Sequence, residues 1–161
     1  MAKIICNTSP FQYLHQSGQL ELLATLAERV FVPPAVVMEL AAGRALGLDL
    51  PTPEALPWVT VDTPRSLPGL ALVRDLGEGE SQVLALALEC QEPRVAILDD
   101  LLARQFARQL GIPHVGTLGI LLQAKKAGLL PQVASVVERL ESLGFRLSAR
   151  TRSEVLKMAG E

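Results

Sequence analysis

The sequence predicts an α/β fold, a three-layer α/β/α sandwich with a short, mostly parallel sheet. Short apolar runs alternate with helical patterns along the chain. Such runs, joined by helical crossovers, are typical of parallel strands that are covered on both faces. The chain has 161 residues, of which 49% are hydrophobic. We therefore expect a single domain, residues 1–161, with a substantial apolar core.

Apolar runs, together with the proline and glycine residues between them, place the individual elements. Strands are expected at 3–6, 30–32, 58–61, 95–98 and 114–115, with 145–147 as a further edge strand. Ser9 followed by Pro10 predicts a helix N-cap and a proline at the first helical position. Further helices are expected at 20–28, from 33–34 through 40, at 80–90, from 101 to 110, from 117, at 133–143 and at the C-terminus. Loops are expected at 41–57 and around Pro64 and Pro68.

The charged residues are unevenly distributed along the chain. Residues 75–100 hold seven acidic residues and one basic residue, whereas residues 101–137 hold four basic residues and no acidic one. This pattern predicts an acidic pocket beside a basic flank, unless it reflects only solvated helix faces. The formal net charge of −2 and the aromatic content of 4% argue against a strongly basic nucleic-acid footprint and a base-stacking platform.

Several classes of protein are disfavoured by what the sequence lacks. Cys6 and Cys90 do not have the spacing of a zinc site, and both adjoin apolar runs, so we expect buried thiols. Lys3 is followed by only three apolar residues before Asn7, which is not a signal-peptide pattern. No apolar stretch approaches the roughly 20 residues of a membrane span. A cytoplasmic protein with no membrane association is expected.

Polar residues stand where a parallel sheet would bring them together. In open α/β sheets, ligands bind outside the carboxyl ends of the strands. The residues that follow the predicted strands, or lie in the first turns of adjoining helices, are Asn7, Thr8, Ser9, Glu39, Glu80, Asp99, Asp100 and Thr117. Oxygen ligands of this kind are those that Mg²⁺ and Mn²⁺ prefer. Carboxylates held close together also repel one another unless a cation neutralises them.

Each of these residues also has a simpler explanation. One of the two consecutive aspartates is expected to cap the helix that follows it. Glu80 suits a helix N-terminus through the helix dipole alone. Glu39 is compatible with an ordinary surface position, Asn7 with a turn, and Thr117 with an N-cap. The functional interpretation therefore depends on the whole set and not on any single residue.

Taken in order, six segments resemble the PIN-domain family, and most closely its DUF3368-like branch of prokaryotic PIN-like proteins. The segments are NTSP at 7–10, VPPAVVMEL at 32–40, LGEGE at 76–80, ILDD at 97–100 with Ala103-Arg104, GTLGIL at 116–121 and AKKAGL at 124–129. They cover nearly the whole chain in one consistent order. The resemblance implies the PIN fold and, with it, a nuclease activity.

The resemblance also implies the roles of individual residues. Proteins of the PIN fold are mostly Mg²⁺- or Mn²⁺-dependent nucleases that cut RNA, and many are the toxin of a toxin–antitoxin pair. By position, Glu39 corresponds to the second acid of the family, Glu80 to the third, and Asp99 or Asp100 to the fourth. Thr117 corresponds to the serine or threonine near the last strand. The implied partners are RNA, or else DNA, and a small antitoxin protein.

The chain departs from the family pattern at the first acid. The nuclease pattern has an aspartate after the first strand, where this chain has Asn7. An amide keeps one carbonyl oxygen that can bind a hard cation, but more weakly than a carboxylate does. The alternative is therefore a catalytically weak or inactive PIN-like module that binds nucleic acid or a protein partner. The aliphatic segments 133–143 and 155–158 would also permit a homodimer.

For the enzyme, the expected reaction is metal-assisted hydrolysis of a phosphodiester bond. One or two Mg²⁺ or Mn²⁺ ions would be held by Asn7, Glu39, Glu80, Asp99 and Asp100. The groups expected to hydrogen-bond the phosphate are Thr8, Ser9 and Thr117. The bases expected to hold the flanking backbone, unless they only form a solvated surface, are Arg104, Arg108, Lys125 and Lys126.

Overall fold

The parallel sheet expected from the sequence is present in the computed structural model, which describes residues 2–66 and 75–161. Within these ranges the strands form one five-stranded sheet in the order β3-β2-β1-β4-β5, and all paired neighbours run parallel. The strands are β1 Lys3–Cys6, β2 Val30–Val32, β3 Val59–Val61, β4 Arg94–Ile97 and β5 His114–Val115. The predicted α/β class is confirmed.

The order of the strands places a crevice next to β1. The chain moves from β1 to β2 and β3 on one side, and β4 then returns to the other side of β1. Cys6 pairs with Ile97 at the carboxyl ends of these two strands, and the Asn7 N–H donates to the Ile97 carbonyl oxygen at 3.2 Å. Ligands of open α/β sheets bind where the strand order reverses in this way. The ends of β1 and β4 are therefore the expected place for a site.

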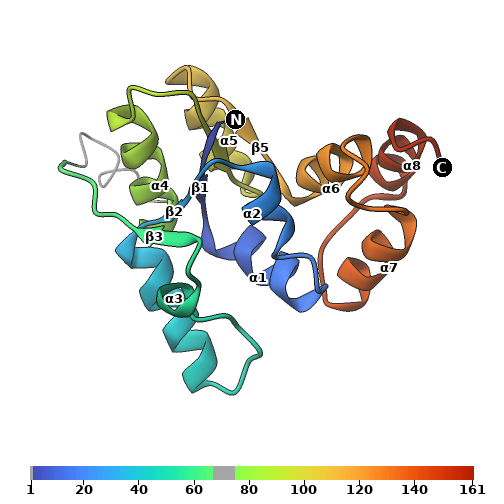
Figure 1. The fold of residues 1–161 in the computed structure, drawn as a ribbon, viewed down its shortest axis with the longest axis horizontal. Coiled ribbons are helices and arrows are strands. Elements are labelled where there is room, and N and C mark those ends of the chain that lie inside the picture. The colour runs from blue at the N-terminus through green and yellow to red at the C-terminus, as the bar shows by residue number, and fades with distance from the viewer. Residues whose placement is uncertain (1, 67–74) are drawn as a thin grey trace.

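Helices cover both faces of the sheet (Figure 1). Helices α4 and α5 lie on one face and α1, α2 and α6 on the other, with α7 and α8 beyond α6. The bounds are α1 Thr8–Gln16, α2 Leu22–Leu26, α3 Pro34–Ala45, α4 Glu78–Glu89, α5 Leu101–Gln109, α6 Thr117–Lys126, α7 Ala134–Ser142 and α8 Ala149–Met158, with a 3₁₀ turn η1 at Pro53–Ala55. Two helical layers thus enclose the sheet, as the three-layer prediction requires.

The core is aliphatic, and α4 is at its centre. Helix α4 packs against the sheet and against both α3 and α5, and its Leu84 side chain is fully buried. Because it is enclosed on several sides, α4 is apolar on more than one face, and burial of a leucine side chain contributes about 2 kcal/mol. The first turn of α4 is polar, with Glu78 and Glu80, and Gly79 in this turn lies against the Asn7 and Glu39 side chains.

Three local predictions were wrong. Residues 145–147 form no strand but link α7 to α8, because Phe145 packs edge-on against Tyr13 of α1 instead of pairing with the sheet. Helix α1 begins at Thr8 with Asn7 as its N-cap residue, two residues earlier than the Ser9-Pro10 pair predicts. Helix α3 continues to Ala45, so the irregular segment after it is shorter than expected.

Pro68 of the second expected loop lies outside the described residues. Within the described ranges, none of the helices combines the length and the apolar character that a bilayer crossing requires.

Candidate active site at the carboxyl end of the sheet

Asn7 directly follows β1, at the point where the strand order reverses between β1 and β4. It has extended backbone angles as the N-cap residue of α1, and its side chain forms no capping hydrogen bond with that helix. The residue is only 3% exposed, and its Oδ1 atom accepts no hydrogen bond from any described residue. A buried polar atom without a partner costs about 1–3 kcal/mol, so such atoms often mark a ligand position.

Glu39 of α3 directs its carboxylate toward the same point. A β-carbon built on Gly79 of α4 would lie 2.8 Å from Asn7 Oδ1 and 2.9 Å from Glu39 Oε1. The two oxygens therefore converge over a position that is open only because residue 79 is glycine. Thr8 Oγ1 donates to the other carboxylate oxygen, Glu39 Oε2, at 2.5 Å. The starts of α1 and α4 and the middle of α3 thus meet around an amide oxygen and a carboxylate.

Asp99 follows β4 and turns inward. Its Oδ1 accepts from the Thr117 backbone N–H at 2.8 Å, and its Oδ2 accepts from Thr117 Oγ1 at 2.6 Å. Burial raises the pKa of the Asp99 carboxyl above its ordinary value, while the hydrogen bonds from Thr117 and the positive charge of Arg104 act in the opposite direction. Thr117 itself is completely buried. The carboxylate is therefore held in one orientation at the end of the sheet.

Cys6 shows that Asp99 lies close to β1 as well. The thiol is completely buried, and burial, followed by the negative charge of Asp99, raises the pKa of Cys6 well above its ordinary value. This thiol stays protonated and is not a nucleophile. It is one of the two buried thiols expected; Cys90 is half-buried.

Asp100, in contrast, points away from the crevice. It is exposed, and its Oδ2 accepts from the backbone N–H of Ala103 at 2.9 Å as the N-cap of α5. One of the two aspartates was expected to have this capping role. Of the pair, Asp99 is consequently the residue that faces the crevice.

Glu80 occupies the first turn of α4, as expected, but its carboxylate folds back over Gly77, the N-cap residue of that helix. This arrangement is typical of an acidic residue at the third helical position. Among the described residues, no three His, Cys, Asp or Glu side chains lie close enough together to hold a metal ion. The structure thus groups Glu39 with Asn7, and Asp99 with Thr117, and does not gather all four predicted acids in one cluster.

The four predicted phosphate-binding bases have different environments. Arg104 lies near Asp99. A β-carbon built on Gly116 would be 3.8 Å from Arg104 Nη1 and 2.9 Å from Asp99 Oδ1, so both side chains approach the same point. Lys125 donates to the Pro131 carbonyl oxygen at 2.7 Å and pairs with Glu161. Arg108 and Lys126 are exposed in the last turns of α5 and α6. Of the four, Arg104 is the base that the structure brings to Asp99.

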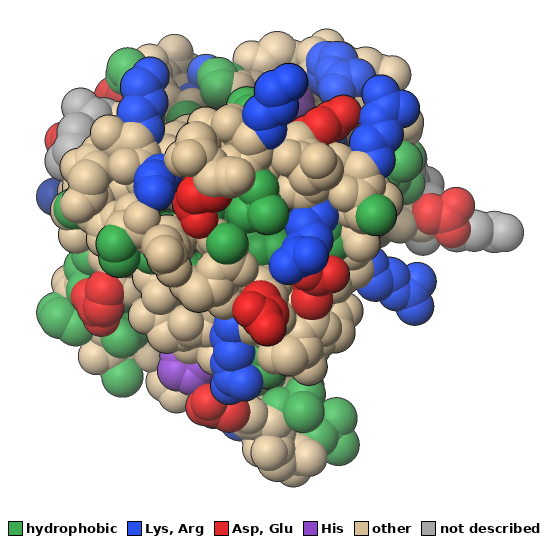
Figure 2. All heavy atoms as spheres, turned by 90° about the vertical axis from the view of Figure 1, so that its right-hand side faces the viewer, with side chains coloured by type: hydrophobic (Ala, Val, Ile, Leu, Met, Phe, Trp, Pro, Cys, Tyr) green, Lys and Arg blue, Asp and Glu red, His purple; other side chains and the backbone are tan. Residues whose placement is uncertain are grey.

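A groove of about 670 Å³ opens beside Asp99. We call it the α6 groove: α1, β5 and α6 line it together with the start of α8 and residues 143–148, which we call the α7–α8 linker. It contains Ser9 and Arg104, and also Arg146, a residue that sequence reasoning missed. Figure 2 looks onto the side of the molecule that carries α6, α7 and α8, where Lys and Arg side chains are interspersed with acids around a small hydrophobic area.

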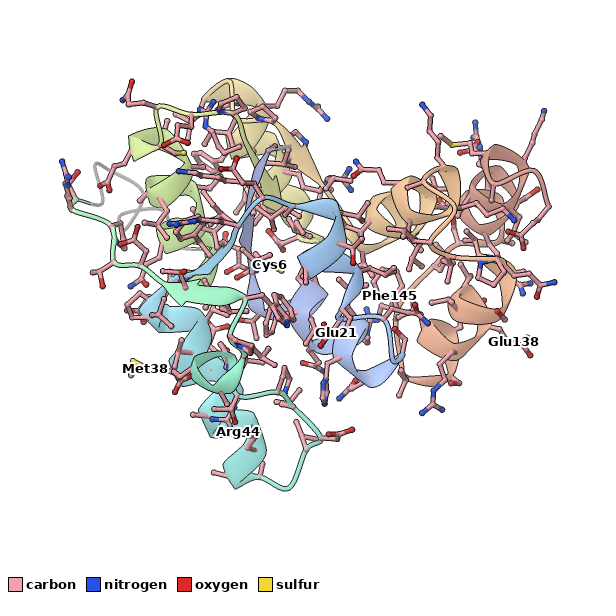
Figure 3. The ribbon with its side chains drawn as sticks, in the orientation of Figure 1. Cys6, Glu21, Met38, Arg44, Glu138 and Phe145 are labelled. Carbon is pink, nitrogen blue, oxygen red and sulfur yellow. The ribbon has the colours of Figure 1, made fainter. Side chains whose placement is uncertain are left out.

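The α7–α8 linker is held in place by an aromatic contact. Phe145 packs against Tyr13 with ring centroids 5.1 Å apart and an interplanar angle of 88°. In Figure 3 the Phe145 side chain lies next to α1. No local sequence signal marks Arg146 as a groove residue, because the position of the α7–α8 linker depends on this contact between residues more than a hundred positions apart.

The comparison with protein families agrees with this arrangement. A family model, DUF3368, described as a PIN domain, matches residues 3–161. The comparison with curated proteins gives no match. The matched segment includes every residue of the crevice and of the α6 groove.

Proposed function

The chain belongs to the DUF3368 family of PIN domains, and we propose on this premise that it is a metal-dependent nuclease that hydrolyses phosphodiester bonds in RNA. The family has a nuclease-type fold. The observation that carries the proposal is the buried, unpartnered Asn7 Oδ1, which faces Glu39 Oε1 across the open position above Gly79. An apolar or purely structural crevice would have no reason to keep an amide oxygen there without a donor.

The donor atoms fit a hard divalent cation. Asn7 contributes an amide oxygen, and Glu39 and Asp99 contribute carboxylates, which are ligands that Mg²⁺ and Mn²⁺ accept. Asn7 and Glu39, whose oxygens face each other above Gly79, would hold the ion. Asp99, which follows the neighbouring strand β4, and Glu80 are the further predicted ligands. The chemistry that such an ion supplies is the activation of a water molecule and the stabilisation of charge on the phosphate.

The remaining residues orient these groups. The Thr8 hydroxyl holds the Glu39 carboxylate through one of its oxygens and leaves the other directed toward Asn7. Thr117 fixes both oxygens of Asp99, each of which still has a free lone pair. Arg104 places a positive charge beside Asp99, where it would contact a phosphate oxygen of the substrate.

A matched pair of variants tests the proposal. Labelled RNA is incubated with the protein in Mn²⁺ or in EDTA, and Asp99→Asn is compared with Asp100→Asn. Both substitutions remove one negative charge at neighbouring positions, and asparagine is as good an N-cap as aspartate. We expect Asp99→Asn and Glu39→Ala to slow Mn²⁺-dependent cleavage about a hundredfold or more, with Asp100→Asn close to the unsubstituted chain. Equal cleavage by Asp99→Asn and Asp100→Asn would refute this assignment.

A second candidate function follows from Asn7. With an amide in place of the first acid, the crevice has one negative charge fewer, which favours a PIN module that binds nucleic acid or a protein with little or no cleavage. The variant Asn7→Asp distinguishes the two. If the unsubstituted chain does not cleave RNA and Asn7→Asp does, the binding module is the correct function.

The toxin role is a finer part of the same proposal. Expression of the chain should arrest the growth of a bacterial host, and Glu39→Ala should relieve the arrest. A small protein encoded next to this chain should then bind it and restore growth. Normal growth during expression of a chain that is active in vitro would argue against the toxin role.

A further inference from the structure

The α6 groove has a charge that differs from that of the whole chain. The chain carries a formal net charge of −2. The groove, within the described residues, is lined by two arginines, Arg104 and Arg146, by His114 and by a single acid, Asp99. A cleft that concentrates positive charge in a weakly acidic protein favours an anionic ligand.

Within the described residues, the two groove arginines lack an ion-pair partner, although Arg104 lies near the Asp99 carboxyl. Neighbouring bases of the C-terminal helices are paired, Arg150 with Glu154 and Arg152 with Glu141. Arg146 is also exposed, so its guanidinium is available to a ligand.

The walls of the groove are apolar between these charges. Leu118 and Leu122 of α6 and Leu147 of the α7–α8 linker contribute side chains to it. The volume of about 670 Å³ lies within the range of small-ligand sites. A double-stranded nucleic acid would present only its backbone here, whereas a single strand can also turn an unstacked base onto an apolar wall.

We infer that the α6 groove is a substrate-binding site for a single-stranded segment of nucleic acid, with Arg146 of the α7–α8 linker binding a backbone phosphate and α6 contacting an unstacked base. This inference rests on the proposed function, because Asp99 belongs both to the groove and to the candidate metal site. The groove leads from Asp99 toward β5, α6 and the linker. The strand is thus held on the β5 side of the bond to be cut.

Binding is measured in EDTA, so that neither metal nor cleavage contributes. The probe is a fluorescein-labelled oligouridylate of about ten nucleotides. Its fluorescence anisotropy is measured as the full chain is added. We expect Arg146→Glu to weaken binding about tenfold. The matched control is Arg139→Glu, an exposed arginine of α7 outside the groove, which should bind within about twofold of the unsubstituted chain.

The salt dependence and an abasic probe test the two contacts separately. Loss of one phosphate contact in Arg146→Ala should reduce the slope of log K against log salt by about 0.7. An oligonucleotide of the same length without bases should bind about tenfold more weakly if the leucine side chains of α6 bury part of a base. Equal binding by Arg146→Glu and Arg139→Glu, or no binding by the unsubstituted chain, would overturn the inference.

The failure of this inference differs from the failure of the proposed function. If RNA is cut in Mn²⁺ but Arg146→Glu binds normally in EDTA, the nuclease stands and the groove is not its substrate site. If binding depends on Arg146 but no cleavage occurs in Mn²⁺, the groove stands and the chain is a binding module.

Discussion

Substitution of Gly79 by alanine should abolish metal binding without unfolding the protein. The added β-carbon would lie 2.8 Å from Asn7 Oδ1 and 2.9 Å from Glu39 Oε1, closer than such atoms can approach. Asn7 is buried and short, whereas the Glu39 carboxylate ends a flexible, exposed side chain. Glu39 therefore has to move, which breaks its bond from Thr8 and separates the two oxygens.

The magnitudes of the two effects differ. Alanine is favoured over glycine inside a helix by up to about 1 kcal/mol, which offsets part of the crowding, so stability in EDTA should change by no more than about 1–2 kcal/mol. Mn²⁺ at a hundred times its dissociation constant stabilises a protein by about 2.7 kcal/mol, or about 8 °C in a chain of this length. We expect that shift in the unsubstituted chain and little or none in Gly79→Ala.

The assay is thermal unfolding with and without Mn²⁺, together with titration of Mn²⁺ by electron paramagnetic resonance. Gly18→Ala is the control, because Gly18 has a φ of +76° and open space around it. Alanine there costs about 1 kcal/mol of backbone strain, yet it should keep the full Mn²⁺ shift. An equal Mn²⁺ shift in Gly79→Ala and the unsubstituted chain, or no shift in either, would refute the reasoning.

Three further predictions concern the stability of the fold. Thr117→Val leaves Asp99 with one hydrogen bond fewer in a buried site and should cost about 1–3 kcal/mol in urea unfolding; an unchanged midpoint would contradict this. Asp100→Ala removes the N-cap of α5 and should cost about 1 kcal/mol, whereas Asp100→Asn should be neutral in the same assay. The pKa of the Glu161 carboxyl is lowered chiefly by hydrogen bonds from two backbone N–H groups at the start of α7. The ionised carboxylate therefore stabilises the fold at pH values above its ordinary pKa, and this stabilisation is lost as the pH falls through the lowered pKa. Melting temperatures measured from neutral pH into this acidic window should therefore converge for Glu161→Gln and the unsubstituted chain. A constant difference between the two over that window would contradict this prediction.

The fold was predictable because its signals are local. Apolar runs of three or four residues correctly indicated β1, β2 and β4, and Gly111, with its positive φ, correctly marked the end of α5. The errors occurred where a distant contact overrides a local preference. The segment 145–147 has the composition of a strand, but Phe145 is held by Tyr13 on α1.

The site was predictable only in part. The polar residues that follow the strands were identified, but two adjacent aspartates with the same chemistry could not be told apart from the sequence. In the structure Asp99 bonds to Thr117, eighteen residues away, and Asp100 bonds to Ala103 in its own helix. Glu80 likewise lies against the start of its own helix, where its sequence position also permits a local role.

By itself, the sequence determined the order of the elements, the parallel sheet and the residues that stand at its carboxyl edge, because periodicity, helix caps and strand ends depend on neighbours along the chain. Only the tertiary structure decided that Asn7 Oδ1 faces Glu39 over Gly79, that Asp99 turns inward, and that Arg146 joins Asp99 in one groove. These arrangements depend on packing between α1, α3, α4 and the α7–α8 linker, segments that are far apart in sequence and meet only when the core forms.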